Sequence, residues 1–288
     1  MDYFVHIAIF IWIYTILSLG LNLVIWYAWL LNVTQAAFYG IWAYITAILT
    51  SRYQMNFFVA MLVGVLVCSV LSYLIWIVLS KFSWDFYALG SIWFNFIVFS
   101  ILLNLESITN GSLGIRWISK PQLFFIDFSP NSYFLILVIA ITALLYLFSK
   151  YIVNSSYWRV LKSIREDEEA IRAFWYDTLY FKLSIFIIWA WFASIAGSLF
   201  ASYMTFIDPT SFTIHESIFM LTIVILGWLA NLKWSVLWAV ILIILPEVLR
   251  FIWMPEEIAA QSRQLMYGLV LVLLMLYRPQ WLIWEYKL

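Results

Sequence analysis

Long apolar stretches, each followed by a short polar segment, recur from one end of the 288-residue chain to the other. A run of about 18 or more apolar residues can cross a hydrocarbon layer of roughly 30 Å as a helix. Both faces of these runs are apolar, whereas the strands of a membrane barrel alternate apolar and polar residues. The predicted spans are 4–29, 34–50, 57–80, 86–104, 132–152, 183–204, 217–231, 235–253 and 264–277. The pattern predicts an all-α, polytopic membrane helix bundle of about nine transmembrane helices, with eight to ten as the range.

Composition supports the same fold class, because 66% of the residues are hydrophobic and only 10% are charged. A soluble core does not need so much apolar surface. No linker or low-complexity tract divides the chain, so we expect residues 1–288 to form a single transmembrane domain. The formal net charge of zero argues against nucleic acid as a partner and leaves the lipid bilayer as the expected surroundings.

One predicted span is interrupted by polar residues at membrane depth. The stretch "YAWLLNVTQAAFYG" contains Asn32, Thr34 and Gln35. Polar side chains are tolerated at this depth where they face other helices, a cavity or a break in the helix. The sequence therefore predicts a discontinuous or re-entrant element here.

Charge is concentrated in one segment, residues 155–183, which contains five acidic and five basic residues. Basic residues are retained on the cytoplasmic side of a membrane, and the loop that contains Asp208 has none. We therefore expect the charged segment to be cytoplasmic, with the loop 105–131 and the Asp208 loop on the opposite side. Counting spans places the N-terminus outside, and Arg278 and Lys287 inside.

The charged segment has helical periodicity. Ser155 or Ser156 can cap a helix whose apolar residues lie on one side, and Asp167 can cap a second short helix. The apolar residues are Trp158, Leu161 and Ile164, and the basic ones on the other side are Arg159, Lys162 and Arg165. Two short amphipathic helices joined at an acidic elbow can form a docking surface. The alternative is an ordinary solvated loop helix.

Five ordered stretches resemble the permease subunits of branched-chain amino-acid ABC importers, over about residues 17–282. "YWRVLKSIREDEEAI" resembles the cytoplasmic loop of that family, and "LGLNLVIWYAWLLNVTQAAFYGIWAY" resembles its long L-N-L to G-Q-A-A-F signature. The other three stretches are "SITNGSLGI", "LGWLANLKWSVLWAVILIILPEVLR" and "YGLVLVLLMLYRPQWL". The chain is therefore similar to the M-type permease of these importers.

This resemblance implies a function for the charged segment. In such importers a permease pairs with a sister permease, two cytoplasmic ATPase subunits drive transport, and a soluble binding protein delivers the amino acid. The segment 153–182 would then be the coupling loop that docks into the ATPase, with Trp158, Leu161 and Ile164 as an apolar anchor. Its expected coupling residues are Trp158, Arg159, Leu161, Lys162, Ile164, Arg165, Glu166, Asp167, Glu168 and Glu169.

The chain itself contains no G-x-x-x-x-G-K-[ST] sequence, so partner ATPases are expected to bind ATP and Mg and to hydrolyse the nucleotide. No cofactor and no catalytic role are expected of the chain. The resemblance implies the plasma (inner) membrane of a bacterial-type cell. Branched-chain amino acids are the expected cargo, while other amino acids and urea stay open.

Polar residues at membrane depth are the candidates for the substrate pathway, because a zwitterionic amino acid needs polar partners on its route. They are Asn32, Thr34, Gln35, Ser91, Asn95, Asn104 and Glu247. Each also has a structural interpretation, since Asn and Thr commonly join membrane helices by hydrogen bonds. Glu247 with Arg250 can equally form an interfacial ion pair, and Pro246 before it can kink the helix.

Two other function classes were weighed. A secondary transporter should have ionisable residues deep in several spans, and apart from Glu247 the predicted span interiors have almost none. An intramembrane enzyme or metal site is disfavoured, because His6 and His215 lie near span ends without metal-ligand spacing. The permease subunit is therefore the favoured function, with the secondary transporter as the alternative.

Tryptophan stands at eight positions where the family pattern has glycine, and the chain has 9 Gly beside 18 Trp. These positions are Trp26, Trp29, Trp42, Trp158, Trp175, Trp228, Trp234 and Trp238. One interpretation is a bundle repacked around aromatic side chains, which the non-glycine changes Leu30, Asn32 and Lys233 in the same motifs favour. The other is glycine codons read as tryptophan through the wrong code table, which UGG codons at all eight positions would exclude.

Overall fold

The computed structural model describes residues 2–28, 32–82, 84–123, 126–227 and 232–252, together with Gly268 and Val272. Long helices dominate these residues. They are α1 (Asp2–Ala28), α2 (Gln35–Ser51), α3 (Phe57–Leu79), α4 (Trp84–Asn104), α6 (Asn131–Val153), α9 (Thr178–Met204), α10 (Ile214–Leu226) and α11 (Leu232–Ile252). The shorter elements are α5 (Glu106–Thr109), η1 (Gly111–Leu113), α7 (Ser156–Glu166), α8 (Glu168–Ala173), η2 (Pro209–Phe212), β1 (Ile115–Arg116), β2 (Gln122–Leu123), β3 (Ile126–Asp127) and β4 (Phe206–Ile207).

The predicted multi-pass helical bundle is confirmed, but its count of about nine spans stays a prediction. Each of the first eight predicted spans corresponds to one of the long helices, and the ninth, 264–277, lies outside the described residues. Within the described part, six helical segments are long and apolar enough to cross a membrane. The helix α2 and the apolar part of α11 are shorter than the others.

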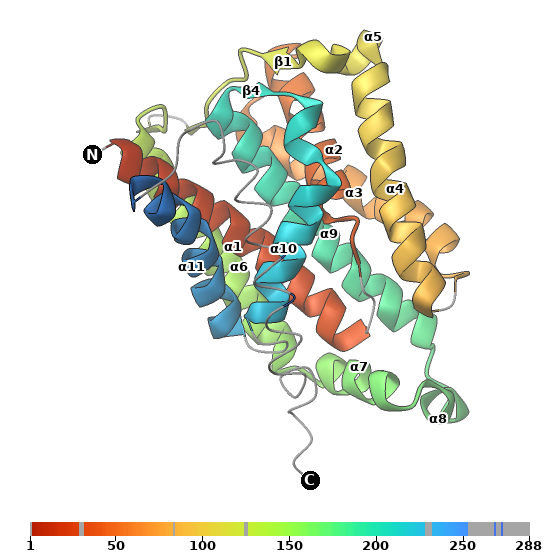
Figure 1. The fold of residues 1–288 in the computed structure, drawn as a ribbon. Coiled ribbons are helices and arrows are strands. Elements are labelled where there is room, and N and C mark those ends of the chain that lie inside the picture. The colour runs from red at the N-terminus through yellow and green to blue at the C-terminus, as the bar shows by residue number, and fades with distance from the viewer. Residues whose placement is uncertain are drawn as a thin grey trace.

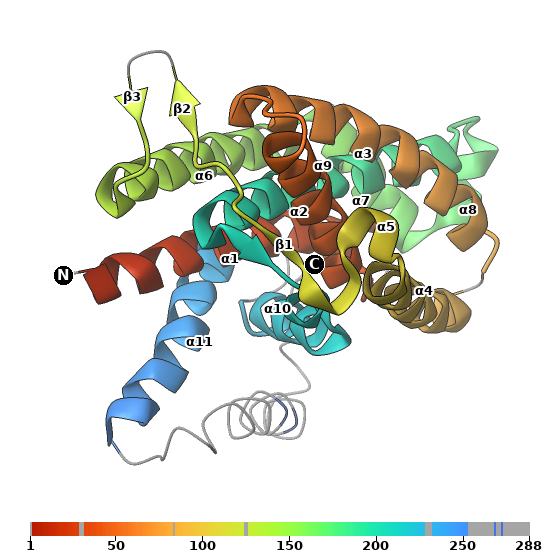
Figure 2. The ribbon, with the colours of Figure 1, turned by 90° about the horizontal axis from the view of Figure 1, so that it is seen from above.

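The long helices form a buried centre and an outer layer. In α1 and α9, 67% of the most apolar 18-residue window is buried, against 28% in α3, α4 and α6. Figure 2 shows α2 and α9 near the middle, with α3, α4 and α6 around them. The outer helices therefore present apolar side chains outward, as expected of surfaces that face lipid.

Small residues allow α2 and α9 to approach each other closely. A Cβ atom at Gly197 of α9 would lie 2.6 Å from the backbone oxygen of Tyr39 in α2, so only glycine fits there. About two turns further along α2, the hydroxyl oxygen of Thr46 lies 2.7 Å from that of Ser198 in α9, at hydrogen-bond distance. Close backbone approach of this kind is how membrane helices gain packing energy without a hydrophobic driving force. The helices α2 and α9 are therefore closely packed in the interior of the bundle.

The loops lie at the two ends as the charge pattern predicts. At one end β1 pairs antiparallel with β4, with Ile115 opposite Ile207, so the loop after α4 and the loop after α9 meet. The N-terminus lies at this end too, since His6 Nδ1 is 2.7 Å from the hydroxyl of Tyr203 near the end of α9. Figure 1 shows α7 and α8 at the opposite end. Arg278 and Lys287 lie outside the described residues.

Two details of the predicted fold need correction. The described residues contain two ribbons of two-residue strands, β1–β4 and β2–β3, in an otherwise helical chain. The segment between the spans is also shorter than the expected 153–182. Val153 ends α6, and α9 begins at Thr178 because the Asp177 carboxylate caps it by accepting the Tyr180 N–H at 3.1 Å.

The tryptophans at family glycine positions occupy contrasting environments. Trp42 is fully buried between α2 and α9, and Trp158 is also buried. Trp175, by contrast, is 96% exposed and has φ of 65°, in the left-handed region that favours glycine. Trp234 is largely exposed, and Trp238 packs at the edge of a small cluster around Phe219. Trp29, Trp228 and the side chain of Trp26 lie outside the described residues.

We predict opposite effects of glycine at Trp42 and Trp175. Trp42→Gly should lower the free energy of unfolding by about 3–5 kcal/mol, because it empties a packed site. Trp175→Gly should be more stable than Trp175→Ala by about 1 kcal/mol, because both variants lose the exposed indole and only glycine avoids the left-handed strain. Thermal unfolding in detergent measures both effects. Equal stability of the two Trp175 variants would contradict the strain argument.

Candidate functional site

The chain between α1 and α2 is not helical where it enters α2, and its polar groups are buried. Residues 32–34 have no regular structure, and Asn32, Val33 and Thr34 are each at most 4% exposed. In a bilayer no water is available to these backbone groups, so protein partners must satisfy them. The polar signature thus coincides with a buried, non-helical stretch before α2, which we call the break, while residues 29–31 lie outside the described residues and the re-entrant element stays a prediction.

Side chains from α4 hold the backbone of this break. The Val33 N–H donates to Ser91 Oγ at 3.1 Å, and the Val33 carbonyl oxygen accepts from Asn95 Nδ2 at 3.0 Å. The Thr34 N–H donates to Asn32 Oδ1 at 2.9 Å, directly before the first residue of α2. Ser91 and Asn95 lie four residues apart on one face of α4, so both reach the same residue.

A residue outside the sequence prediction completes the arrangement. Ser217 Oγ of α10 accepts from the Ala36 N–H in the first turn of α2 at 2.8 Å and from Asn95 Nδ2 at 2.7 Å. We call the side chains of Asn32, Thr34, Ser91, Asn95 and Ser217 the polar cluster. Each of them is 0–1% exposed. The polar cluster joins α2, α4 and α10 in the interior of the bundle.

Gln35 connects the same point to the two central helices. Its Nε2 donates to the Leu17 carbonyl oxygen of α1 at 3.3 Å, and its Oε1 accepts from the indole N–H of Trp189 in α9. Both ends of the amide are thus used within the chain. Gln35 therefore braces α2 against α1 and α9, and Trp189 is a second residue that sequence reasoning missed.

Two polar atoms of the cluster stay unsatisfied. Asn32 Nδ2 and Asn95 Oδ1 are buried and have no hydrogen-bond partner among the described residues. The first is a donor and the second an acceptor, and each belongs to an amide whose other atom is bonded at the α2 N-terminus. Buried polar atoms are normally paired, and these two atoms at the break are among the exceptions in the described part of the chain.

The structure places the other two pathway candidates elsewhere. Asn104 lies at the end of α4, where it is exposed and its Nδ2 donates to the Ser100 carbonyl oxygen at 2.8 Å. Glu247 of α11 accepts from the Tyr3 hydroxyl at 2.5 Å. Another carboxylate, Glu216 in the first turn of α10, accepts from the Tyr14 hydroxyl at 2.7 Å. Five of the seven candidates thus meet at the break, while Asn104 and Glu247 do not.

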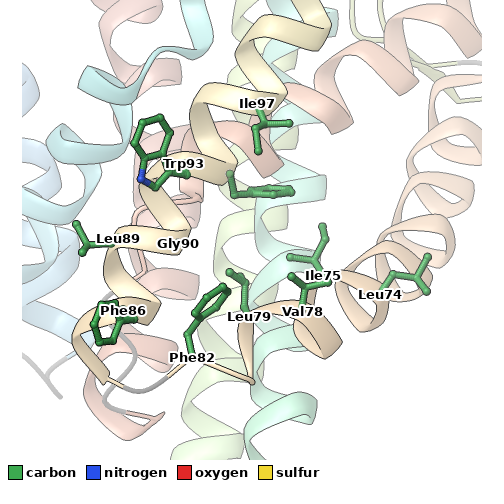
Figure 3. Close-up of a pocket in the computed structure, with 11 residues that line it drawn as sticks. Leu74, Ile75, Val78, Leu79, Phe82, Phe86, Leu89, Gly90, Trp93 and Ile97 are labelled. Atoms are coloured by element: carbon green, nitrogen blue, oxygen red, sulfur yellow. The ribbon is translucent and has the colours of Figure 1, made fainter.

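The outer face of α4 borders an apolar groove, shown in Figure 3, with a volume of about 530 Å³. Its lining residues come from α3, α4 and the turn between them and carry no charged group. They are Leu74, Ile75, Val78, Leu79, Phe82, Phe86, Leu89, Gly90, Trp93, Phe94 and Ile97. Trp93 is 67% exposed, whereas Ser91 and Asn95 are buried. The helix α4 therefore presents a polar face to the break and an apolar face outward.

The charged segment folds as the expected pair of short helices, but its apolar face has a different role. Trp158, Leu161 and Ile164 are at most 3% exposed and pack within the chain, where α7 lies against α1. They therefore attach α7 to the bundle and are not presented as an anchor for a partner. Helical periodicity identified the apolar face correctly but did not identify what covers it.

Glu168 fixes α8 to the start of α9. Its carboxylate accepts from Lys182 Nζ at 2.6 Å, from Arg172 at 2.9 Å and from the Thr178 hydroxyl at 2.9 Å. Partial burial raises the pKa of Glu168, but these hydrogen bonds and the charges of Lys182 and Arg172 outweigh it and hold the pKa below its ordinary value. Asp167 caps α8 as predicted, accepting the Ala170 N–H at 2.9 Å. Glu168 is thus a positioning residue within the loop.

We predict that the Gln35–Trp189 brace behaves as a coupled pair. Gln35→Ala should destabilise the protein by about 1–3 kcal/mol, because the buried indole N–H loses its acceptor. Gln35→Leu combined with Trp189→Phe should cost less than the sum of the single changes, because both polar groups are then absent. Thermal unfolding of four proteins, namely the wild type, Gln35→Leu, Trp189→Phe and the double variant, gives the coupling energy. If the stability changes of the two single variants add up to that of the double variant, Gln35 and Trp189 are not energetically coupled.

The chain matches a family profile described as the permease component of branched-chain amino acid transport systems, over residues 3–277. It is 33% identical to the "High-affinity branched-chain amino acid transport system permease protein LivM" of Salmonella typhimurium, and 32% identical to the protein of that name from Escherichia coli. Both alignments cover 97% of this chain and 69% of the relative.

A third relative comes from an archaeon. The "Probable branched-chain amino acid transport permease protein LivM" of Methanocaldococcus jannaschii is 29% identical over 60% of this chain and 53% of its own length. No solved structure matches the chain significantly. Because the family profile covers nearly the whole chain, and two relatives exceed 30% identity, this protein belongs to the permease-component family of branched-chain amino acid transport systems.

Proposed function

We propose that this chain is a membrane-spanning permease subunit of an ATP-driven importer that translocates branched-chain amino acids. The observation that supports it is the family match, which extends across the central break and the charged loop together. The relatives carry this transport activity in their names. A sister permease, two ATPase subunits that bind ATP and Mg, and a soluble binding protein would complete the importer.

The loop 154–177 is the proposed contact with the ATPase subunits. Its position at the end opposite to the β1–β4 ribbon suits a cytoplasmic site, given that basic residues favour that side. The Glu168 network makes the loop a fixed surface, and Arg159, Glu166, Asp167 and Glu169 are exposed on it. Charged groups on such a surface orient a partner and set its rate of association.

The plasma membrane of a bacterial-type cell is the proposed location, with the N-terminus outside. The alternative function, a secondary transporter, requires ionisable groups on an ion pathway in several spans. The two carboxylates described at the ends of α10 and α11, Glu216 and Glu247, each accept a hydrogen bond from a tyrosine of α1. These bonds join helices, so they support the permease over the secondary transporter.

Reconstituted transport tests this function. The chain would be co-expressed with the neighbouring genes for a sister permease, two ATPases and a binding protein, and the complex placed in proteoliposomes. We expect ATP-dependent uptake of L-leucine that disappears without the binding protein or without this chain. Uptake driven by an ion gradient in the absence of ATP would instead support the secondary transporter.

We predict that exposed acidic residues of the loop contribute to ATPase binding. Glu166→Lys with Glu169→Lys should weaken recovery of the ATPase subunits in an affinity pull-down while leaving thermal stability unchanged, because both side chains are exposed. Glu168→Gln is the contrasting control, since it should lower stability by loosening α8 from α9. If the double variant recovers the ATPases as well as the wild type does, Glu166 and Glu169 do not contribute to the interface.

A further inference from the structure

We propose that the polar cluster at the α1–α2 break binds the main-chain groups of the transported amino acid. The substrate carboxylate would lie at the N-terminus of α2 beside the Asn32 amide nitrogen, and the substrate ammonium would lie beside the Asn95 amide oxygen. This inference rests on the proposed function, because it assigns the transported molecule to a site in the same chain. It goes further by giving each charged group of the substrate a named partner.

The two unsatisfied atoms carry the argument. Asn32 Nδ2 is a buried donor without a partner among the described residues, and Asn95 Oδ1 is a buried acceptor in the same condition. Leaving such atoms unpaired away from water is costly, so a site that retains them needs a ligand or water for part of its working cycle. A zwitterion supplies an acceptor for the first atom and a donor for the second. Asn32 Nδ2 thus suits the substrate carboxylate, and Asn95 Oδ1 suits the substrate ammonium.

The position of α2 explains how a carboxylate is bound without a basic side chain. The helix has 17 residues and begins at Gln35, and the N–H groups of its first turn point back toward the break. The aligned peptide dipoles give this end a partial positive charge that favours an anion. None of the five side chains of the polar cluster is basic, so the helix end supplies the complementary charge.

Aromatic side chains next to the cluster provide an apolar wall. Phe38 lies one turn beyond Thr34 in α2, and Phe94 precedes Asn95 in α4, with their ring centroids 5.9 Å apart. Trp189 of α9 also packs on Phe38, at 4.6 Å between ring centroids. A branched aliphatic side chain would contact Phe38 and Phe94 while the main-chain groups meet the polar cluster. The site therefore favours amino acids with apolar side chains over polar ones.

The described arrangement is a closed form of the site. All five side chains of the cluster are 0–1% exposed, so an amino acid must enter by separation of α4 from α2. Ser91 and Asn95 are the side chains of α4 that bond to the break. A ligand that bonds to Asn95 Oδ1 acts on the same side chain whose Nδ2 holds the Val33 carbonyl oxygen, which couples binding to movement of α4.

Photo-crosslinking on the complete transporter tests the location directly. The probe is photo-leucine, an L-amino acid with a diazirine in its side chain, applied to the permease–ATPase complex and followed by peptide mass spectrometry. We expect labelled peptides that contain residues 32–38 or 91–98, and suppression of labelling by L-leucine. Labelling confined to other peptides overturns the proposal. Wild-type uptake measured in parallel separates this outcome from failure of the proposed function, in which L-leucine is not transported at all.

A variant and two competitors test the assignment of the groups. Asn32→Ser removes the amide Nδ2 that would reach the carboxylate, while the shorter side chain keeps an oxygen that can accept the Thr34 N–H. It should weaken competition by L-leucine about tenfold or more, as expected for a lost hydrogen bond to a charged group. Competition by 3-methylbutylamine, which lacks the carboxylate, should not change. Asn104→Ala is the matched control outside the cluster. Equal weakening of both competitors, or weakening by Asn104→Ala, would show a structural role only and overturn the assignment.

Discussion

A helix that breaks inside a membrane leaves backbone groups that water cannot reach, and the satisfaction of those groups constrains the rest of this fold. The Val33 N–H and carbonyl oxygen are both held by side chains of α4, and the Ala36 N–H is held by Ser217 of α10. These bonds fix helices that are far apart in the sequence. Once these polar groups are satisfied, the remaining apolar surfaces of α4 and α10 need only fit the shapes of neighbouring helices or face lipid.

The charged loop depends on the same bundle in a different way. The buried face of α7 packs on α1, the helix that leads into the break, and Glu168 fastens α8 to α9, the helix that holds Gln35 through Trp189. The loop and the break are therefore attached to the same two central helices. A force applied to the loop acts directly on α1, on α9 and on α6, which leads into the loop, whereas α3 and α4 lie in the outer layer.

The sequence predicted most of the spans and five of the residues at the break, because polar residues within apolar runs are rare and informative. It could not predict Ser217 or Trp189, since a serine near a span end and a tryptophan in an aromatic-rich helix carry no distinguishing pattern. The sequence also could not predict that Trp158, Leu161 and Ile164 are buried within the chain. Periodicity identifies an apolar face, but only the packed structure shows whether that face meets the same chain or a partner.

The tryptophans at family glycine positions can be judged position by position from their surroundings. Trp42 lies opposite Gly197, where a Cβ would be 3.2 Å from the Cβ of Trp42 and 2.6 Å from the Tyr39 backbone oxygen. Gly197 thus allows the α9 backbone to approach α2 closely at the position of Trp42, and the side chain of Trp42 is fully buried there. Trp175, by contrast, is almost fully exposed and adopts a left-handed backbone. The full burial of Trp42 therefore favours adaptation at that position, whereas the backbone geometry at position 175 is that of glycine. The codon at position 175 is the one whose identity separates the two interpretations.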